Sequence, residues 1–379
     1  MNNLTLNLER YGFTKVDSIG ILSGKNKPFF NISGGVQFED YISGVMQANP
    51  DMKMVCNIQP CLRVLGLKDN LPLVGKTGRH HIFFNMLGHF AFYPKIHRTQ
   101  LKKIMIISAY ETLVDCGIKK ISATCHPLDF ETQDIWSSMS VDYVLSEKNL
   151  DTNPSGNRNA YRTEILYTLP EGETRELWNI VMYQFDQNSN LLDYIAADSG
   201  ASVDRIMSAR EGVNSNYENS NWGPFVSMLN EYLKHDTKEC LWRIADLSKA
   251  IIELSLCVNF DSTGPGHVFK RVFRILIEEC FHESLNVFKV LEYTSNFFGV
   301  EYKYLLFKEE ITKYLKIIKN GCSVFEKQFY QNKISKELFF DRYGFPISFS
   351  EKILSTNLEF LNSLKQNIDL YESYTKKMT

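Results

Sequence analysis

The sequence predicts an α+β fold, in which a domain built on a sizeable, mainly antiparallel sheet flanked by helices is followed by an all-helical domain. Short β-rich runs alternate with turns in the first part of the chain, and the spacing of apolar residues becomes helical almost throughout after residues 220–240. We therefore place the two domains at residues 1–235 and 236–379. The composition is that of a globular protein, with 44% hydrophobic and 23% charged residues, so each domain can bury its own core.

The first domain contains several runs with the composition of β-strands. Some are apolar on both faces, as expected for strands inside a covered sheet. In chain order the runs are Lys103–Ser108, Lys119–Thr124, Glu164–Leu169, Leu177–Phe185 and Leu192–Ala197. The first run conflicts with its surroundings, because Thr99–Cys116 as a whole has the spacing of an amphipathic helix.

The second domain places apolar residues three and four positions apart, which predicts helices. The predicted helices are Trp222–Lys234, Lys238–Val258, His267–Cys280, Tyr302–Gln331 and Leu354–Tyr374. A glycine- and proline-containing break at Asp261–Gly266 offers Ser262 or Thr263 as the cap of the helix that follows.

Net charge and cysteine usage exclude several classes of protein. The formal net charge is −2, so any nucleic acid must be bound by a local basic patch rather than by an overall positive field. None of the eight cysteines forms a CxxC pair, and we expect free thiols in a reducing cytosol and no zinc site. Met1–Phe13 is too polar for a signal peptide, and no apolar run approaches the roughly 20 residues of a membrane span. A soluble, cytoplasmic protein without a membrane partner is expected.

The segment Cys61–Phe92 concentrates residues suited to nucleotide chemistry. Arg63, Arg79 and His80 bring polar nitrogen atoms close to Phe84 in a stretch punctuated by glycines. Arginine binds phosphate through charge-assisted hydrogen bonds, and an aromatic ring offers a face to a base. The same composition also fits a surface hairpin with an incidental basic cluster beside core phenylalanines.

The order and spacing of these residues resemble motif 2 of the alanyl-tRNA synthetases, which are class II aminoacyl-tRNA synthetases. Val74–Phe92 follows the family pattern VGxTxRHHTFFEMLGNFSF nearly residue for residue. The likeness covers residues 25–350, and its other parts are Phe30–Phe38 (motif 1), Glu176–Phe185, Asp198–Arg205 (motif 3), Gly212–Tyr217, Ile244–Arg274 and Phe340–Pro346. It implies the class II antiparallel sheet flanked by helices.

The resemblance implies that ATP and Mg²⁺ are used to activate an amino acid. Arg63 is expected to hold the amino-acid carboxylate and the α-phosphate. Arg79 and Arg205 are expected to bind the outer phosphates, and Phe84 is expected to stack on the adenine. Arg63 and Arg205 are the catalytic residues on this view. The full ATP set implied is Arg63, Arg79, His80, Phe84, Glu164, Gly200 and Arg205, with Glu164 as the Mg²⁺ contact. Glu164 also fits a surface acid at the end of a strand.

The resemblance also implies an amino-acid pocket. It assigns the substrate ammonium to Asp198, a pocket wall to Trp178 and the floor to Gly200, with Arg63 at the carboxylate and Gly35 where the family has a methionine. A buried tryptophan also fits ordinary core, and an aspartate before a turn fits a helix cap. The chain departs from the family around this pocket at Gly35, Asn157–Ile165, Ser202 and Asp204. Alanine is the expected substrate, with another small amino acid as the alternative.

The second domain carries the residues that the resemblance assigns to tRNA. The family aspartate is retained as Asp341 and the family asparagine falls on Ser262, while Lys270, Arg271 and Arg274 keep part of a basic helix. These residues suit contacts with phosphates or an acceptor stem. A solvated helix face explains the basic residues equally well.

The sequence ends shortly after Phe340–Pro346, so we expect no editing domain and no family C-terminal domain. A small pocket rejects close competitors poorly, which favours a specialised, editing-deficient paralogue. The expected function is activation of alanine or a similar small amino acid and transfer to tRNA. Transfer to a carrier protein or small amine is the alternative, and a noncatalytic paralogue that binds tRNA or a partner is the second.

Overall fold

The computed structural model describes residues 2–24, 27–47, 53–64, 69–153, 158–233, 237–329, 335–356 and 358–377. The chain forms two compact units, Met1–Pro224 and Phe225–Thr379. The boundary predicted from the sequence, between residues 235 and 236, lies outside the described residues, as do Asn157, Lys234 and Gln331 at the ends of predicted segments.

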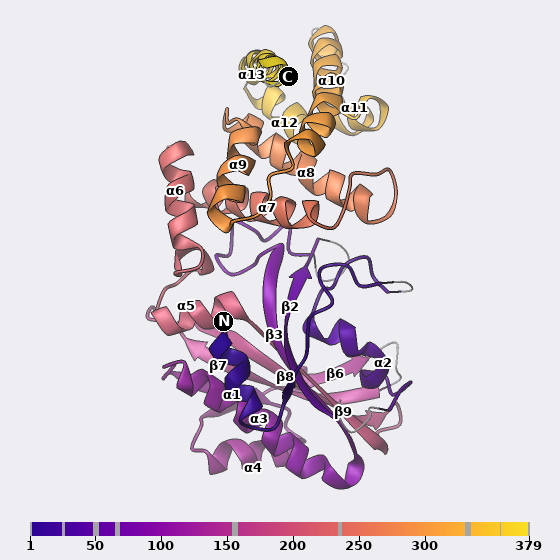
Figure 1. Cartoon of the computed structure of the whole chain (residues 1–379), viewed down its shortest axis with the longest axis vertical. Helices are drawn as coiled ribbons and strands as arrows, with labels where there is room; N and C mark the ends of the chain where they lie inside the picture. The colour runs from indigo at the N-terminus through magenta and orange to yellow at the C-terminus, as the bar shows by residue number, and fades with distance from the viewer. Residues whose placement is uncertain are drawn as a thin grey trace. The chain divides into compact units, whose positions relative to one another are not determined.

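The first unit is organised around one mixed sheet (Figure 1). Within the described residues its strands follow the order β1-β2-β3-β9-β8-β7-β4-β5, with β6 beside β7. The β1–β2 and β4–β5 pairs are parallel and the other pairs are antiparallel, which confirms the predicted, mainly antiparallel sheet. The strands are β1 (Thr14–Lys15), β2 (Met54–Leu62), β3 (Phe83–Pro94), β4 (Ile121–Cys125), β5 (Tyr143–Leu145), β6 (Leu150–Asn153), β7 (Arg158–Thr168), β8 (Thr174–Asp186) and β9 (Leu191–Ser202).

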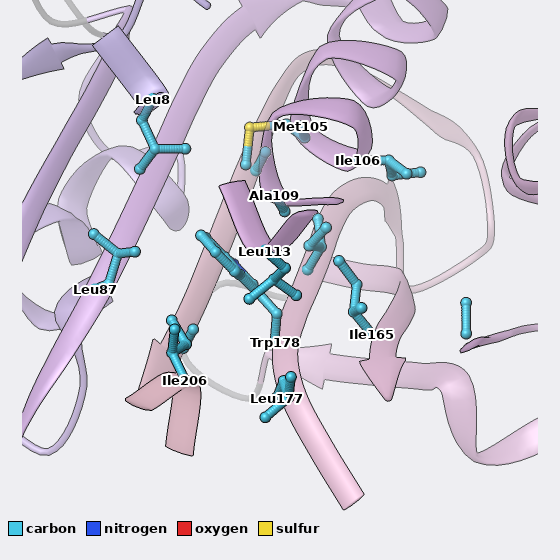
Figure 2. Packing of buried hydrophobic residues seen from close by; sticks show 14 of the residues in the cluster. Leu8, Leu87, Met105, Ile106, Ala109, Leu113, Ile165, Leu177, Trp178 and Ile206 are labelled. Carbon is cyan, nitrogen blue, oxygen red and sulfur yellow. The ribbon is translucent and has the colours of Figure 1, made fainter. Parts of the chain in front are cut away.

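Helices cover one face of this sheet and enclose the main core. They are α1 (Asn2–Glu9), α3 (Arg98–Asp115), α4 (Phe130–Ser138) and α5 (Val203–Glu211). Leu87, Trp178 and Ile180 point from the strands into this core and meet Met105 and Leu113 of α3. Figure 2 shows Trp178 among these apolar side chains. Burying such residues is the main stabilising contribution to a fold of this kind.

The run Lys103–Ser108 is helical, so its prediction as a strand is wrong. It lies inside α3, and the helical spacing of Thr99–Cys116 was the correct signal. Leu101, Met105 and Ala109 recur at four-residue intervals on the buried face of α3. A short window of apolar residues cannot separate a strand from a buried helix, whereas the longer window can.

The opposite face of the sheet is covered only in part. A 3₁₀ turn at Gly34–Phe38 and the short α2 (Glu39–Ile42) place Phe38 and Ile42 against Phe90 and Phe92 of β3. Further along the same face, Gly88 of β3 pairs with Gly200 of β9, so the two strands present no side chains there. This bare strip is the floor of the site described below.

The second unit is helical throughout its described residues, as predicted. Its helices are α7 (Lys238–Ser255), α8 (Gly264–His282), α9 (Val287–Phe298), α10 (Tyr304–Phe329), α11 (Lys336–Tyr343), α12 (Ile347–Ser355) and α13 (Glu359–Lys377), while α6 (Gly223–Leu233) crosses the point where the units divide. The predicted helix Leu354–Tyr374 is interrupted, because α12 ends at Ser355 and Leu358 has a φ of 74°. Thr263 is the N-cap of α8, although its side chain makes no capping hydrogen bond. None of the described helices has the length and apolar character needed to cross a membrane.

Candidate active site

A cleft of about 890 Å³ opens on the partly covered face of the sheet in the first unit. Its walls come from strands β3, β6, β7, β8 and β9, from the start of α5, and from the segments that precede β2 and β3. Six of the residues expected to act on ATP or the amino acid line it, namely Arg63, Arg79, Phe84, Asp198, Gly200 and Arg205. The structure therefore brings together residues that are up to 142 positions apart in the chain.

Arg63 is held in place by the backbone of motif 1 and by Phe84. Its Nε donates to the carbonyl oxygen of Ile32 at 2.8 Å, and its guanidinium lies 4.9 Å from the centre of the Phe84 ring. Burial lowers the pKa of the Arg63 guanidinium, but arginine stays protonated at neutral pH. The remaining guanidinium nitrogens are thus a fixed positive charge beside an aromatic face, which suits a nucleotide.

Arg79 owes its position to the segment Gly212–Tyr217. Asn216 donates to the carbonyl oxygens of Gly78, through its backbone at 2.7 Å, and of Arg79, through its amide side chain at 3.2 Å. The Tyr217 hydroxyl donates to the carbonyl oxygen of His80 at 3.0 Å. These bonds fix the backbone of the loop, whereas the Arg79 side chain is 39% exposed and lies 3.8 Å from Glu173. A partly exposed arginine on a loop held by these bonds is available to contact a phosphate.

Arg205 lies on the first turn of α5 and points back into the cleft. Its guanidinium is 3.8 Å from the carboxylate of Glu176, which also lines the cleft. Burial lowers the pKa of Arg205, and Glu176 opposes that effect. With Arg63 and Arg79, Arg205 gives this end of the cleft three positive charges, opposed by Glu176 and, at Arg79, by Glu173, and the remaining positive charge is suited to phosphates.

The two histidines of motif 2 have different surroundings. His80 does not line the cleft, because its Nδ1 is hydrogen-bonded to Thr77 Oγ1 at 2.7 Å. Burial, followed by Arg205 and Arg79, lowers the pKa of His80 to about 4, so it is neutral at pH 7. His81 lines the cleft instead and stacks on Trp222 with ring centres 4.6 Å apart.

Two carboxylates near the arginines have the chemistry of a Mg²⁺ site. Burial, followed by Glu176, raises the pKa of Glu164, which indicates that the two side chains lie near one another. Mg²⁺ is commonly held by one or two carboxylates together with substrate phosphates, so the pair fits that ion. Glu164 itself does not line the cleft; it is drawn toward Arg162, whose Nε lies 3.3 Å away, and Thr124. Among the described residues, no group of three or more histidine, cysteine or acidic side chains is arranged around a metal.

Asp198 forms the other end of the cleft together with two glycines. A Cβ atom on Gly35 would lie 2.9 Å from Asp198 Oδ2, so the absence of a side chain there lets the carboxylate approach the backbone of motif 1. A Cβ atom on Gly200 would lie 2.9 Å from Met86 Sδ, and Met86 also lines the cleft. A carboxylate beside a glycine floor is suited to an ammonium group.

Trp178 lies on the other face of the sheet, contrary to its expected role as a pocket wall. It is fully buried, belongs to the main core, and donates from Nε1 to Ser199 Oγ at 2.6 Å (Figure 2). Alternation along β8 explains this, because Trp178, Ile180 and Met182 share the core face. Sequence reasoning recognised the strand but did not apply its two-residue period to Trp178.

The same alternation places three unpredicted side chains in the cleft. Asn179, Val181 and Tyr183 of β8 face it, and Asp151 and Arg162 extend the wall on β6 and β7. Arg162 lies within Asn157–Ile165, the segment recognised as a departure from the family. The period-2 pattern of the predicted strand Leu177–Phe185 was the signal that could have identified the first three.

The residues expected to contact tRNA lie just before α8, within α8 and on α11 of the second unit. Ser262, Arg271 and Asp341 are exposed and Lys270 is half-buried. Arg274 is committed within the unit, because its Nε and one terminal nitrogen donate to the buried carboxylate of Glu310 at 3.0 and 2.8 Å. Its guanidinium also lies over Tyr314, so a structural role accounts for Arg274.

Comparison with known proteins identifies the family. A family model described as tRNA synthetases class II (A) matches residues 9–360. The chain is 26% identical to the alanine–tRNA ligase of Sulfurovum sp. (strain NBC37-1), over 92% of this chain and 45% of the relative. It is 27% identical to that of Aliarcobacter butzleri (strain RM4018), over 90% and 45%. It thus spans a little under half the length of these curated relatives.

Apo histidyl-tRNA synthetase of S. aureus is a similar solved structure, with 13% identity, a TM-score of 0.41, and coverage of 62% of this chain and 75% of that chain. Since the family model covers well over half of the sequence, the chain belongs to the class II tRNA synthetases.

Proposed function

We propose that this protein activates a small amino acid with ATP, forming the aminoacyl-adenylate, and transfers the aminoacyl group to tRNA. The observation that carries the proposal is the convergence of Arg63, Arg79, Phe84 and Arg205 on one cleft that also contains Asp198. Alanine is the reference substrate, because the curated relatives are alanine–tRNA ligases. The proposed enzyme is thus a ligase of the alanine–tRNA ligase type.

The two ends of the cleft divide the work of the first step. In that step a carboxylate oxygen of the amino acid attacks the α-phosphorus of ATP, the new P–O bond forms, and pyrophosphate leaves. Asp198 binds the substrate ammonium, and Arg63 draws the substrate carboxylate and the α-phosphate together despite their like charge. Arg79 and Arg205 hold the charge that accumulates on the departing pyrophosphate. Phe84 offers its ring to the adenine. Preorganised cations of this kind lower the barrier because they are in place before the reaction begins.

Mg²⁺ fits the same step. In this proposal Glu176, which lines the cleft, and Glu164 would be the carboxylates that hold the ion together with the substrate phosphates. When bound there, Mg²⁺ supplies further neutralisation of phosphate charge. His80 is neutral and hydrogen-bonded to Thr77, so we assign it to the support of the Arg79 loop rather than to contact with ATP.

Amino-acid-dependent exchange of pyrophosphate into ATP tests the first step, and charging of total tRNA tests the second. We expect exchange with at least one small amino acid, and we expect Arg63→Ala to lower its rate by about 10²–10³-fold, as the loss of a charged donor at a transition state does. Arg10→Ala is the matched control, because Arg10 is an exposed arginine of the same unit outside the cleft.

Each outcome discriminates between the candidate functions. Exchange followed by charging supports the proposal. Exchange without charging indicates that a carrier protein or small amine receives the aminoacyl group instead of tRNA. An absence of exchange with every amino acid supplied, in a folded protein, contradicts the proposal and favours a noncatalytic paralogue that binds tRNA or a partner.

A further inference from the structure

Arg175 of β8 lies beside the phosphate end of the cleft without lining the cleft itself. It shares a cavity of about 20 Å³ with Arg79 and Arg205, two arginines that also line the cleft. A cavity of this size holds about one water molecule and is too small for a phosphate group. Arg175 is therefore close to the arginines of the proposed ATP site, but it is not placed to contact ATP from this cavity.

Both terminal nitrogens of the Arg175 guanidinium are engaged within the first unit. Nη1 donates to the carbonyl oxygen of Asn214 at 2.6 Å, and Nη2 donates to Glu173 Oε2 at 2.7 Å. The Arg175 side chain is only 20% exposed. Hydrogen bonds from a charged donor are stronger than those between neutral groups, and the planar guanidinium fixes its two acceptors relative to one another.

The hairpin that joins β7 to β8 holds Asn214 at two points. Arg175, the second residue of β8, binds the backbone carbonyl of Asn214. Glu171, in the turn between the two strands, accepts a hydrogen bond from the side-chain amide of Asn214. These two bonds attach the segment Gly212–Tyr217, which follows α5, to the sheet.

The segment Gly212–Tyr217 in turn holds the loop that carries Arg79. Its last three residues donate hydrogen bonds to the carbonyl oxygens of three successive loop residues, Gly78–His80. Arg175 is thus connected to the backbone of Arg79 through one intervening segment, and these links are hydrogen bonds of 2.6 to 3.2 Å. Because a displacement of about 1 Å can lower a rate by about 10²-fold, this connection affects what Arg79 can do.

Glu173 makes a second and weaker connection between Arg175 and Arg79. Its Oε2 accepts the hydrogen bond from Arg175, and its Oε1 lies 3.8 Å from the Arg79 guanidinium. Glu173 is 54% exposed, and an exposed ion pair at this separation contributes little. The connection through Asn214 is therefore the stronger of the two.

We propose that Arg175 is a positioning residue, which holds the Arg79 loop at the edge of the cleft through Asn214 and the segment Gly212–Tyr217. Without Arg175 the segment loses one of its attachments to the sheet, and Arg79 spends less time where it can reach the outer phosphates of ATP. The effect on ATP rests on the proposed function, whereas the effect on the loop does not.

Hydrogen exchange of the ligand-free protein tests the effect on the loop. Arg175→Met keeps an apolar stem in place of the arginine side chain and removes its donors. We expect the backbone amide of Asn216, which donates to the carbonyl oxygen of Gly78, to exchange about tenfold faster in this variant. The measurement is mass spectrometry of peptides that span Gly212–Tyr217. Amides in the paired strands β3 and β9 should exchange at unchanged rates, which shows that the variant is folded.

Pyrophosphate exchange tests the effect on ATP. We expect Arg175→Met to raise the KM for ATP by about tenfold and to leave the KM for the amino acid unchanged. In the Arg79→Ala variant the same substitution should change the KM for ATP by less than about twofold, because Arg175 acts through Arg79. Arg175→Lys retains a charged donor and should raise this KM less than Arg175→Met does. Arg98→Met is the matched control, because Arg98 is also a partly buried arginine in an ion pair of the first unit but does not line the cleft.

Two results would overturn the inference. One is unchanged hydrogen exchange of the segment Gly212–Tyr217 in a folded Arg175→Met variant. The other is the full rise in the KM for ATP in the Arg79→Ala variant, which would mean that Arg175 contacts the phosphates itself. Faster hydrogen exchange of the segment in a protein that exchanges no pyrophosphate contradicts the proposed function but supports the attachment of the loop. Pyrophosphate exchange that Arg63→Ala lowers and Arg175→Met does not alter contradicts the positioning role but not the proposed function.

Discussion

The two ends of the cleft follow the family pattern to different degrees. At the phosphate end, Arg63, Arg79, Phe84 and Arg205 all line the cleft, as the resemblance implied. At the amino-acid end, Asp198 and Gly200 are in place, but Trp178 lies in the core and polar residues of β6, β7 and β8 form the wall. On the proposed function, ATP is bound at the first end and the amino acid at the second, so the difference assigns substrate selectivity to the second end.

The backbone is held differently at the two ends: loops at the phosphate end are fixed by hydrogen bonds from other segments, whereas the strands of the amino-acid end are fixed by their pairing in the sheet. The carbonyl oxygens of Gly78, Arg79 and His80 accept bonds from Ser215, Asn216 and Tyr217, and Arg63 is tied to the carbonyl oxygen of Ile32. The wall of the amino-acid end is formed on these strands by side chains that contact one another, such as Arg162 with Asp151 and Glu164. Side chains can be exchanged without moving the chain, which allows this end to change first.

Removing Arg205 should have the largest effect on activity, and this effect should be confined to the use of ATP at the phosphate end. We expect Arg205→Ala to lower kcat/KM for ATP in pyrophosphate exchange by about 10²–10³-fold, since it removes a half-buried cation from the proposed site of the outer phosphates. Arg210→Ala, on the same helix but 46% exposed and paired with Glu211, is the control and should retain activity. If Arg205→Ala raised the KM for the amino acid and spared ATP, the assignment of the two ends would be reversed.

Motif order was sufficient to predict which residues meet at the proposed phosphate end, and their contacts with ATP stay a prediction. Each expected residue there sits in a long matched segment, and the glycines and the Gly212–Tyr217 segment that shape the loop are also in the sequence. His80 is the exception, since its neighbour His81 lines the cleft instead. Which of two adjacent residues points inward depends on the local backbone, and motif spacing alone does not determine it.

The amino-acid end was harder to predict because it depends on strand register. A strand directs alternate side chains to opposite faces, so an error of one residue moves a tryptophan from the core to the pocket. Asp151 and Arg162 meet only because β6 pairs with β7, a contact that no local pattern encodes. The fold itself was predictable, and its one wrong strand, Lys103–Ser108, came from a window shorter than the helix that contains it.

Replacing Trp178 tests its place in the core, with a smaller expected effect. Trp178→Phe removes the donor to Ser199 Oγ and creates a small void in the core. We therefore expect the free energy of unfolding to fall by about 2–3 kcal/mol. The KM for the amino acid should not change. Denaturant unfolding of Trp178→Phe, Ser199→Ala and the double variant should give a combined loss smaller than the sum, because the second change removes the orphaned partner. A raised KM with unaltered stability would instead restore Trp178 to the pocket.

Adding one methyl group at Gly35 should give the smallest effect and the one most specific to the amino-acid end. A Cβ atom there would lie 2.9 Å from Asp198 Oδ2, so Gly35→Ala must push the carboxylate away from its present position. We expect the KM for the amino acid to rise by about tenfold, equivalent to about 1.4 kcal/mol, with the KM for ATP unchanged. The same substitution is made in the Asp198→Asn variant as a check. If Gly35 acts through the Asp198 carboxylate, Gly35→Ala should raise the KM for the amino acid much less in that variant than in the unaltered protein. If the effects of Gly35→Ala and Asp198→Asn on this KM were fully additive, Gly35 would act on the substrate independently of Asp198. The amino-acid site would then have to be placed at the backbone of motif 1.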